Sequence, residues 1–129
     1  MNLRKRIISG ALAVLGAGSA LTVATVVEPA PAHAYSYYGA MSLSPSTGAT
    51  GRAWDYPDST SAQNAAMSVC GYSDCKIVVT MVNGCGAIAK GSDYWGYGWA
   101  PSLYRAQSNA LYYSGGGYVY DWVCTSGHS

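Results

Sequence analysis

Residues 38–54 read YGAMSLSPSTGATGRAW and residues 85–99 read CGAIAKGSDYWGYGW, and this imperfect repetition decides the fold. The likeness extends to two further pairs of segments, residues 62–66 with 106–110 and residues 76–82 with 117–123. Two copies are too few to build a solenoid or a propeller. The duplication therefore predicts one domain made of two pseudo-symmetric halves.

The strands of the first half follow from its turns and β-branched residues. Residues 36–43 and 49–56 are predicted strands, joined by the turn-forming run Ser44-Pro-Ser-Thr-Gly48. A β-branched run predicts a third strand over residues 77–82. The dipeptide Asn83-Gly84 follows it directly, and this pair is typical of a tight hairpin.

A helix is predicted over residues 60–69, between the second and third strands. Asp58 or Ser59 is placed to cap its first turn, and Gly71 is placed to end it. Its apolar positions follow the i, i+3, i+4, i+7 spacing of a buried helix face, with Ala62, Ala65, Ala66 and Val69.

The second half repeats this plan. Its predicted elements are strands over 85–90, 94–99 and 118–124 and a helix over 103–113. Ser102 caps that helix, and Gly115-Gly-Gly117 breaks the chain after it. The sequence thus predicts an α+β fold: a single small domain of two β-β-α-β halves, with a mainly antiparallel sheet, two helices and two disulfides.

Residues 1–34 have the layout of a secretory signal. A basic head, an apolar run and a small-residue cleavage site follow one another at Arg4-Lys-Arg6, residues 7–27 and Ala32-His-Ala34. Cleavage would leave residues 35–129 as a secreted domain, extracellular or associated with the cell envelope. An uncleaved anchor is the alternative, because the apolar run is long enough to cross a bilayer.

All four cysteines lie in the predicted secreted part, where an even number predicts disulfides. If successive strands alternate in direction, Cys70 and Cys75 lie at one end of the domain and Cys85 and Cys124 at the other. Cα atoms more than about 7 Å apart cannot be bridged, so Cys70–Cys75 and Cys85–Cys124 are the expected bonds. A zinc site is the competing interpretation, but it needs two close pairs. We expect no metal and no cofactor.

The charge of residues 35–129 is low. Four basic and five acidic side chains give a net charge of −1. Such a surface lacks the cluster of Lys and Arg side chains that would attract nucleic acids or anionic lipids. We therefore expect no nucleic-acid partner and, after cleavage, no membrane partner.

Four motifs follow one another along residues 37–124. They are Tyr38-Gly-Ala-Met-Ser-Leu-Ser-Pro-Ser-Thr-Gly48, the Cys70–Cys75 segment before a β-branched strand, Asn83-Gly-Cys-Gly-Ala-Ile-Ala89 and Gly96-Tyr-Gly-Trp99. In this order and spacing, the chain resembles a family of small exported proteins, common in mycobacteria and other actinobacteria, of the DUF4189 type. That family is a domain of unknown function, so the resemblance implies no catalytic residue.

Few residues in the predicted secreted part suit catalysis. Its only histidine, His128, is next to the last residue and is interpreted as part of a tail. Asp55 and Asp58 are close in sequence, but turn and capping roles explain both. A small secreted hydrolase acting on a cell-wall or extracellular polymer is the alternative function. It would need a cleft that gathers carboxylates from among Asp55, Asp58, Asp93 and Asp121.

Aromatic residues favour a binding role instead. All 12 Tyr and all 4 Trp lie after residue 34, and such side chains supply large, rigid contact areas. Period 2 places Trp95, Tyr97 and Trp99 on one strand face, and Arg52 occupies the same face of the equivalent strand. Because Arg52 indicates a face that reaches water, we expect Trp95 and Tyr97 to be exposed. The expected site binds a glycan, or a host or competitor protein, in a monomer or weak dimer.

Overall fold

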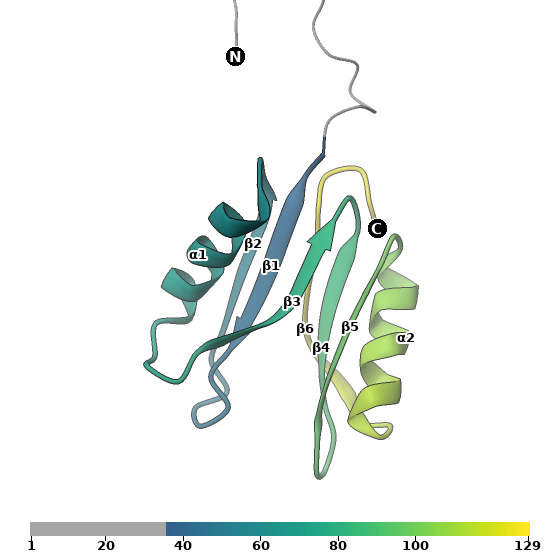
Figure 1. The fold of residues 1–129 in the computed structure, drawn as a ribbon. Coiled ribbons are helices and arrows are strands. Elements are labelled where there is room, and N and C mark those ends of the chain that lie inside the picture. The colour runs from purple at the N-terminus through teal and green to yellow at the C-terminus, as the bar shows by residue number, and fades with distance from the viewer. Residues whose placement is uncertain (1–35) are drawn as a thin grey trace, which may run out of the picture. The chain divides into compact units, whose positions relative to one another are not determined.

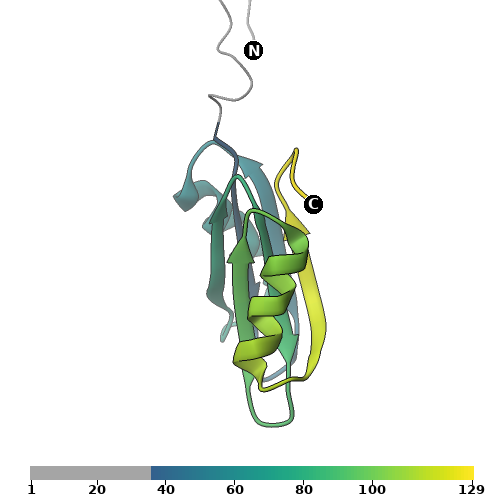
Figure 2. The same ribbon diagram turned by 90° about the vertical axis from the view of Figure 1, so that its right-hand side faces the viewer.

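Two three-stranded antiparallel sheets form the centre of the domain in the computed structural model, which describes residues 36–129. In the first sheet β1 (Tyr38–Leu43) lies between β2 (Thr50–Tyr56) and β3 (Lys76–Val82). In the second, β4 (Cys85–Lys90) lies between β5 (Trp95–Ala100) and β6 (Tyr118–Cys124). Helix α1 (Ser59–Cys70) covers the outer face of the first sheet (Figure 1), and Figure 2 shows α2 (Leu103–Ser114) lying along the second. The predicted α+β fold of two β-β-α-β halves is confirmed. The predicted signal, residues 1–34, lies outside the described residues.

The two sheets face each other across an apolar core. This inter-sheet core comprises Met41, Val79, Met81, Ile88 and Val123. The outer face of each sheet is lined with alanine and packs against its helix. The layers therefore run α1, first sheet, second sheet, α2, and the middle core is the apolar core that both halves share.

Glycines on the outer faces let the helices approach the sheets closely. A β-carbon on Gly51 would lie 1.9 Å from the carbonyl oxygen of Ala66 in α1. A β-carbon on Gly96 would lie 2.0 Å from the carbonyl oxygen of Ala110 in α2. Both distances are far below van der Waals contact, so only glycine fits. These glycines therefore allow each helix to pack closely on its sheet.

The helix ends agree with the sequence signals. Asp58, and not Ser59, caps α1 by accepting a hydrogen bond from Ser61 N at 2.8 Å. Ser102 caps α2, and both helices end at a glycine in the left-handed conformation, Gly71 and Gly115.

The predicted buried face of α1 is wrong at one position. Val69 is exposed, and Cys70 is buried in its place. Cys70 lies four residues after buried Ala66, and the i, i+4 spacing follows the helix face toward the sheet. Its disulfide bond also fixes this end of the helix.

The Asn83-Gly84 turn joins the two sheets and does not close a hairpin. Asn83 has the left-handed backbone that the motif favours, with φ of 50°. However, β3 pairs only with β1, whereas β4 pairs with β5 and β6. The backbone and side chain of Asn83 hydrogen-bond to Tyr37, both at 2.9 Å. The predicted hairpin is therefore wrong, because the strands on either side of the turn belong to different sheets. The bonds to Tyr37 hold the turn against the start of β1.

The pseudo-symmetry extends to strand register. Tyr38 pairs with Val82 in the first sheet, and at the equivalent place Cys85 pairs with Cys124 in the second. The structural counterpart of residues 76–82 is thus 118–124, and the sequence match to 117–123 is wrong by one residue. Apolar residues lie on both faces of these strands, so residue type alone does not fix their register.

Both predicted disulfides are confirmed. Cys70–Cys75 closes the α1–β3 connection, and Cys85–Cys124 joins neighbouring strands at the other end. Beyond the second bond, Thr125 donates its N–H to Gly84 O at 2.9 Å, which fixes the start of the C-terminal tail. Neither helix in residues 36–129 is long and apolar enough to cross a membrane.

Candidate functional site

A surface groove lies where the edge strands β2 and β6 face each other. Its volume is about 780 Å³. We call it the β2–β6 groove, and its lining residues are Gly48, Ala49, Thr50, Arg52, Trp54, Val69, Tyr120 and Asp121. Because the two strands belong to different halves, the groove exists only after both halves have folded.

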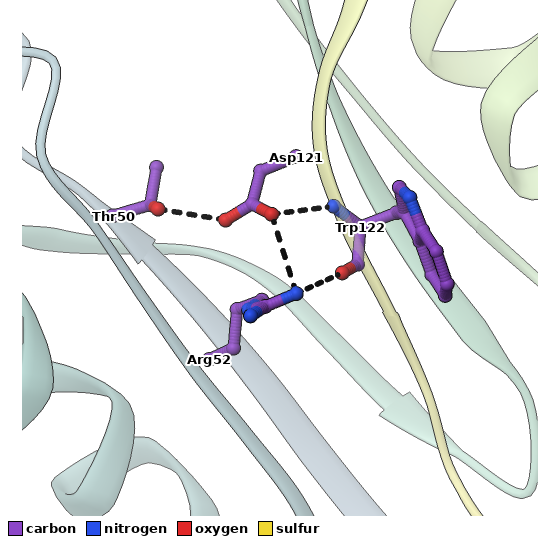
Figure 3. Close-up of polar contacts among 4 residues, drawn as sticks. All are labelled: Thr50, Arg52, Asp121 and Trp122. Atoms are coloured by element: carbon purple, nitrogen blue, oxygen red, sulfur yellow. Dashed lines mark hydrogen bonds and ion pairs between the residues drawn. The ribbon is translucent and has the colours of Figure 1, made fainter.

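A polar network crosses the groove from β2 to β6 (Figure 3). Asp121 accepts a hydrogen bond from Thr50 Oγ1 at 2.7 Å and lies 3.6 Å from Arg52 Nη1. Arg52 Nη1 also donates to the backbone oxygen of Trp122 at 3.0 Å, and Trp122 N donates to Asp121 Oδ1 at 2.9 Å. With 47% of the Arg52 side chain exposed, this ion pair contributes at most about 1 kcal/mol.

Aromatic residues flank the network. Trp54 lines the groove with 49% of its surface exposed. The hydroxyl of Tyr120 donates to Gly48 O at 2.6 Å, which ties β6 to the β1–β2 turn. The ring of Trp122 points away from Arg52, so only its backbone takes part (Figure 3). The groove thus combines one indole face, one guanidinium and one carboxylate that is already paired.

On the opposite side of the domain, where β5 faces β3, aromatic side chains fill the space that corresponds to the groove. Trp95 and Tyr97 occupy the places of Thr50 and Arg52 in the repeat, but both pack partly buried against the inter-sheet core. Burial raises the pKa of the Tyr97 hydroxyl above its usual value. The expectation that Trp95 and Tyr97 are exposed is therefore wrong. The apolar rings fill the space between the sheets that polar Thr50 and Arg52 leave open.

Trp99 is separated from this filled region. Its side chain is 45% exposed, as expected for a binding residue. It lines a smaller pocket of about 190 Å³ together with Tyr38, Ser59, Thr80, Met81 and Val82. The four binding residues expected from the sequence therefore do not form one surface: Arg52 lies in the groove, Trp99 lies in the pocket on the other side, and the rings of Trp95 and Tyr97 pack against the inter-sheet core.

The four candidate carboxylates of the alternative hydrolase do not converge in the described part of the chain. Asp55 accepts hydrogen bonds from the backbone and hydroxyl of Ser126, Asp58 caps α1, and Asp121 belongs to the groove network. Asp93 lies in the β4–β5 turn. The β2–β6 groove is lined by one carboxylate, whereas hydrolysis of a glycosidic bond needs two on either side of the bond.

Two other titratable groups, Asp74 and His128, have local polar partners. Hydrogen bonds from Ser44 and Ser46 lower the pKa of Asp74 to about 2, and they join the Cys70–Cys75 loop to the β1–β2 turn. His128 Nδ1 lies 3.0 Å from Pro101 O. Among residues 36–129, no three His, Cys, Asp or Glu side chains gather as a metal site.

Several groove residues were not found from the sequence as binding residues. Trp54 had a detectable signal, because it matches Trp99 in the repeat. Val69 was assigned to the helix core, and Asp121 appeared only as a carboxylate for hydrolysis. The position of Tyr120 depends on a bulge in β6, where Ile88 pairs with Asp121 but Ala89 pairs with Val119. No residue pattern in β6 predicts that bulge.

Comparison with known proteins gives a consistent group of relatives. The family described as domain of unknown function (DUF4189) matches residues 38–124. Protein Rv1269c of Mycobacterium tuberculosis is 43% identical over 93 residues, which are 72% of this chain and 73% of that protein. Uncharacterized protein Rv1813c of the same species is 36% identical over 89 residues, 68% of this chain and 60% of that protein. The NMR structure of Rv1813c has a TM-score of 0.57 at 29% identity, over 87% of this chain and 96% of that one.

Proposed function

The chain belongs to the DUF4189 family, and from that premise we propose that it is an exported, noncatalytic binding module whose ligand occupies the β2–β6 groove. The ligand is a glycan or a protein of the cell envelope or the extracellular space. The groove itself carries this proposal, since it places a half-exposed indole beside a half-exposed guanidinium.

The binding chemistry follows from these two side chains. Within residues 36–129, the hydrogen bonds and ion pair of Arg52 use Nη1 alone, which leaves Nη2 and Nε for a ligand. A guanidinium recognises carboxylates and carbonyl oxygens through parallel N–H groups. The exposed face of Trp54 supplies apolar contact area for a sugar ring or a side chain.

A noncatalytic role is supported by the distribution of the acids. The groove holds one carboxylate, which Thr50, Arg52 and Trp122 N already engage. Asp55, Asp58 and Asp93 have places elsewhere in the fold. Within residues 36–129, the groove therefore does not offer the paired carboxylates that the secreted hydrolase left open by the sequence would require.

Export is supported by two features. Both cysteine pairs of the domain are oxidised, which suits an extracytoplasmic compartment. The segment before residue 35 carries the sequence layout of a cleaved signal. The intact mass of protein recovered from the culture medium tests this point: it should start at Tyr35, and recovery only in membranes with Met1 retained would contradict it.

Affinity capture tests the binding proposal. Immobilised wild-type protein and the variants Trp54→Ala and Trp99→Ala are incubated with solubilised cell-wall glycan and with culture-supernatant proteins. We expect one ligand to be retained by the wild type and by Trp99→Ala and to be lost with Trp54→Ala. Equal retention by all three would place the binding site outside the groove, and retention of no glycan and no protein would contradict a binding role.

A further inference from the structure

We infer that the free edge of β6 at Trp122 is a strand-addition site for an extended peptide, and that Asp121 and Arg52 occupy this edge when no ligand is bound. The inference rests on the proposed binding function of the β2–β6 groove and specifies its ligand class. It concerns main-chain atoms, which no residue pattern identifies as a binding site.

The backbone groups of Trp122 point away from the sheet. Residues opposite each other in an antiparallel pair alternate between hydrogen-bonded pairs and narrower pairs whose N–H and C=O groups face outward. Cys85 and Cys124 are separated by 4.0 Å between Cα atoms, as in a narrow pair. Trp122, opposite Ala87, lies two residues further along and is therefore also an outward-facing position.

Two side chains satisfy these outward groups. Asp121 Oδ1 accepts from Trp122 N at 2.9 Å, and Arg52 Nη1 donates to Trp122 O at 3.0 Å (Figure 3). Together they present one acceptor and one donor, which is the set that a residue of an added strand would present. The side chains thus stand in for a missing neighbouring strand.

This arrangement can be displaced. Arg52 is 47% exposed, and its ion pair with Asp121 spans 3.6 Å, so it is a weak surface contact. Charged side chains commonly protect edge strands from pairing, and the bulge at Tyr120 limits pairing to the last residues of β6. A short peptide segment opposite Asp121–Cys124 therefore fits this edge better than a long strand.

An extended peptide matches this site better than a glycan. In strand addition, main-chain hydrogen bonds supply affinity and neighbouring pockets select alternate side chains. The β2–β6 groove lies beside the edge and offers Trp54 for one side chain. Once released from Trp122, Arg52 is free to pair with an acidic side chain of the peptide.

Peptides selected on the purified protein from a displayed library of random linear peptides test the inference. We expect enriched peptides whose binding shifts the NMR resonance of the Trp122 amide and slows its hydrogen exchange. Methylation of the peptide nitrogen that faces Trp122 O should abolish binding. The variant Asp121→Ala should bind the same peptide about three- to tenfold more tightly, because one competing hydrogen bond is gone. Asp93→Ala, the same change in an exposed turn, should leave the affinity unchanged.

Several results would overturn the inference. Weaker binding by a folded Asp121→Ala variant would mean that this carboxylate contacts the ligand directly. Equal binding of the N-methylated peptide, or the absence of any enriched peptide, would exclude strand addition. Dimerisation of free Asp121→Ala with no peptide enriched on the wild type would assign the edge to a second copy of the chain. If soluble glucose or N-acetylglucosamine oligosaccharides quench the fluorescence of Trp54 while no peptide binds, the proposed function stands and the peptide inference fails.

Discussion

The two disulfides are expected to differ in their contribution to stability. Cys85–Cys124 closes a loop with a sequence separation of 39 and Cys70–Cys75 one of 5. In the chain-entropy model these loops restrict the unfolded state by about 4 and about 2 kcal/mol. Cys85, Cys70 and Cys75 are buried and Cys124 is half-buried, so replacing either pair by alanine removes similar buried sulfur. The difference of about 2 kcal/mol is therefore a loop effect.

Urea unfolding followed by tryptophan fluorescence measures this difference. The double variants Cys85→Ala/Cys124→Ala and Cys70→Ala/Cys75→Ala are compared with the wild type at neutral pH. We expect the first to lose about 2 kcal/mol more of its unfolding free energy than the second. Equal losses, or a larger loss at Cys70–Cys75, would refute the loop argument and show that contacts of the short loop dominate.

Three further predictions follow from single side chains. Gly96→Ala should lower the unfolding free energy by about 1 to 3 kcal/mol, because its β-carbon meets the α2 backbone, and thermal unfolding measures this loss. Trp95→Ala should lower the free energy of unfolding by about 2 to 4 kcal/mol, because Trp95 packs against the core. Trp54→Ala should lower it by less than about 1 kcal/mol, because Trp54 is half-exposed. Similar losses for the two variants in urea unfolding would contradict the burial assignment. Asp74 has a pKa lowered from 3.8 to about 2, so its hydrogen bonds stabilise the fold above pH 3.8 and are lost as the pH falls toward 2. Asp74→Asn should therefore be less stable than the wild type near neutral pH, and the gap should close on acidification; a constant gap would rule out this carboxylate as its source.

The secondary structure was predictable because its signals are local. Asp58, Ser102, Gly71 and Gly115 mark helix ends through contacts within one turn. The disulfide pairing was also accessible, since strand direction alone decides which end of the domain each cysteine reaches. Partition into two sheets was not predictable, because Asn83-Gly84 specifies a turn conformation and says nothing about which strands pair on either side of it.

The binding groove was harder to predict because burial depends on the facing sheet. Trp95 and Tyr97 occupy strand positions equivalent to Thr50 and Arg52, and period 2 places all four on equivalent strand faces, which in the structure are turned toward the other sheet. Whether such a face is exposed to solvent depends on the side chains of the facing sheet. This information is absent from the strand itself and appears only when both halves are assembled.

The duplicated fold explains why one side of the domain has a polar groove while aromatic side chains fill the equivalent place on the other side. If the two halves were identical, the inner face of β2 would contact β6 in the same way as the inner face of β5 contacts β3. On one side, Tyr97 and Trp95 extend the inter-sheet core and stabilise the association of the halves. On the other, Arg52 and Thr50 meet Asp121 through exposed polar contacts that add little stability. Since the aromatic side already holds the sheets together, the β2–β6 side can exchange its internal contacts for those of a ligand without loss of the fold.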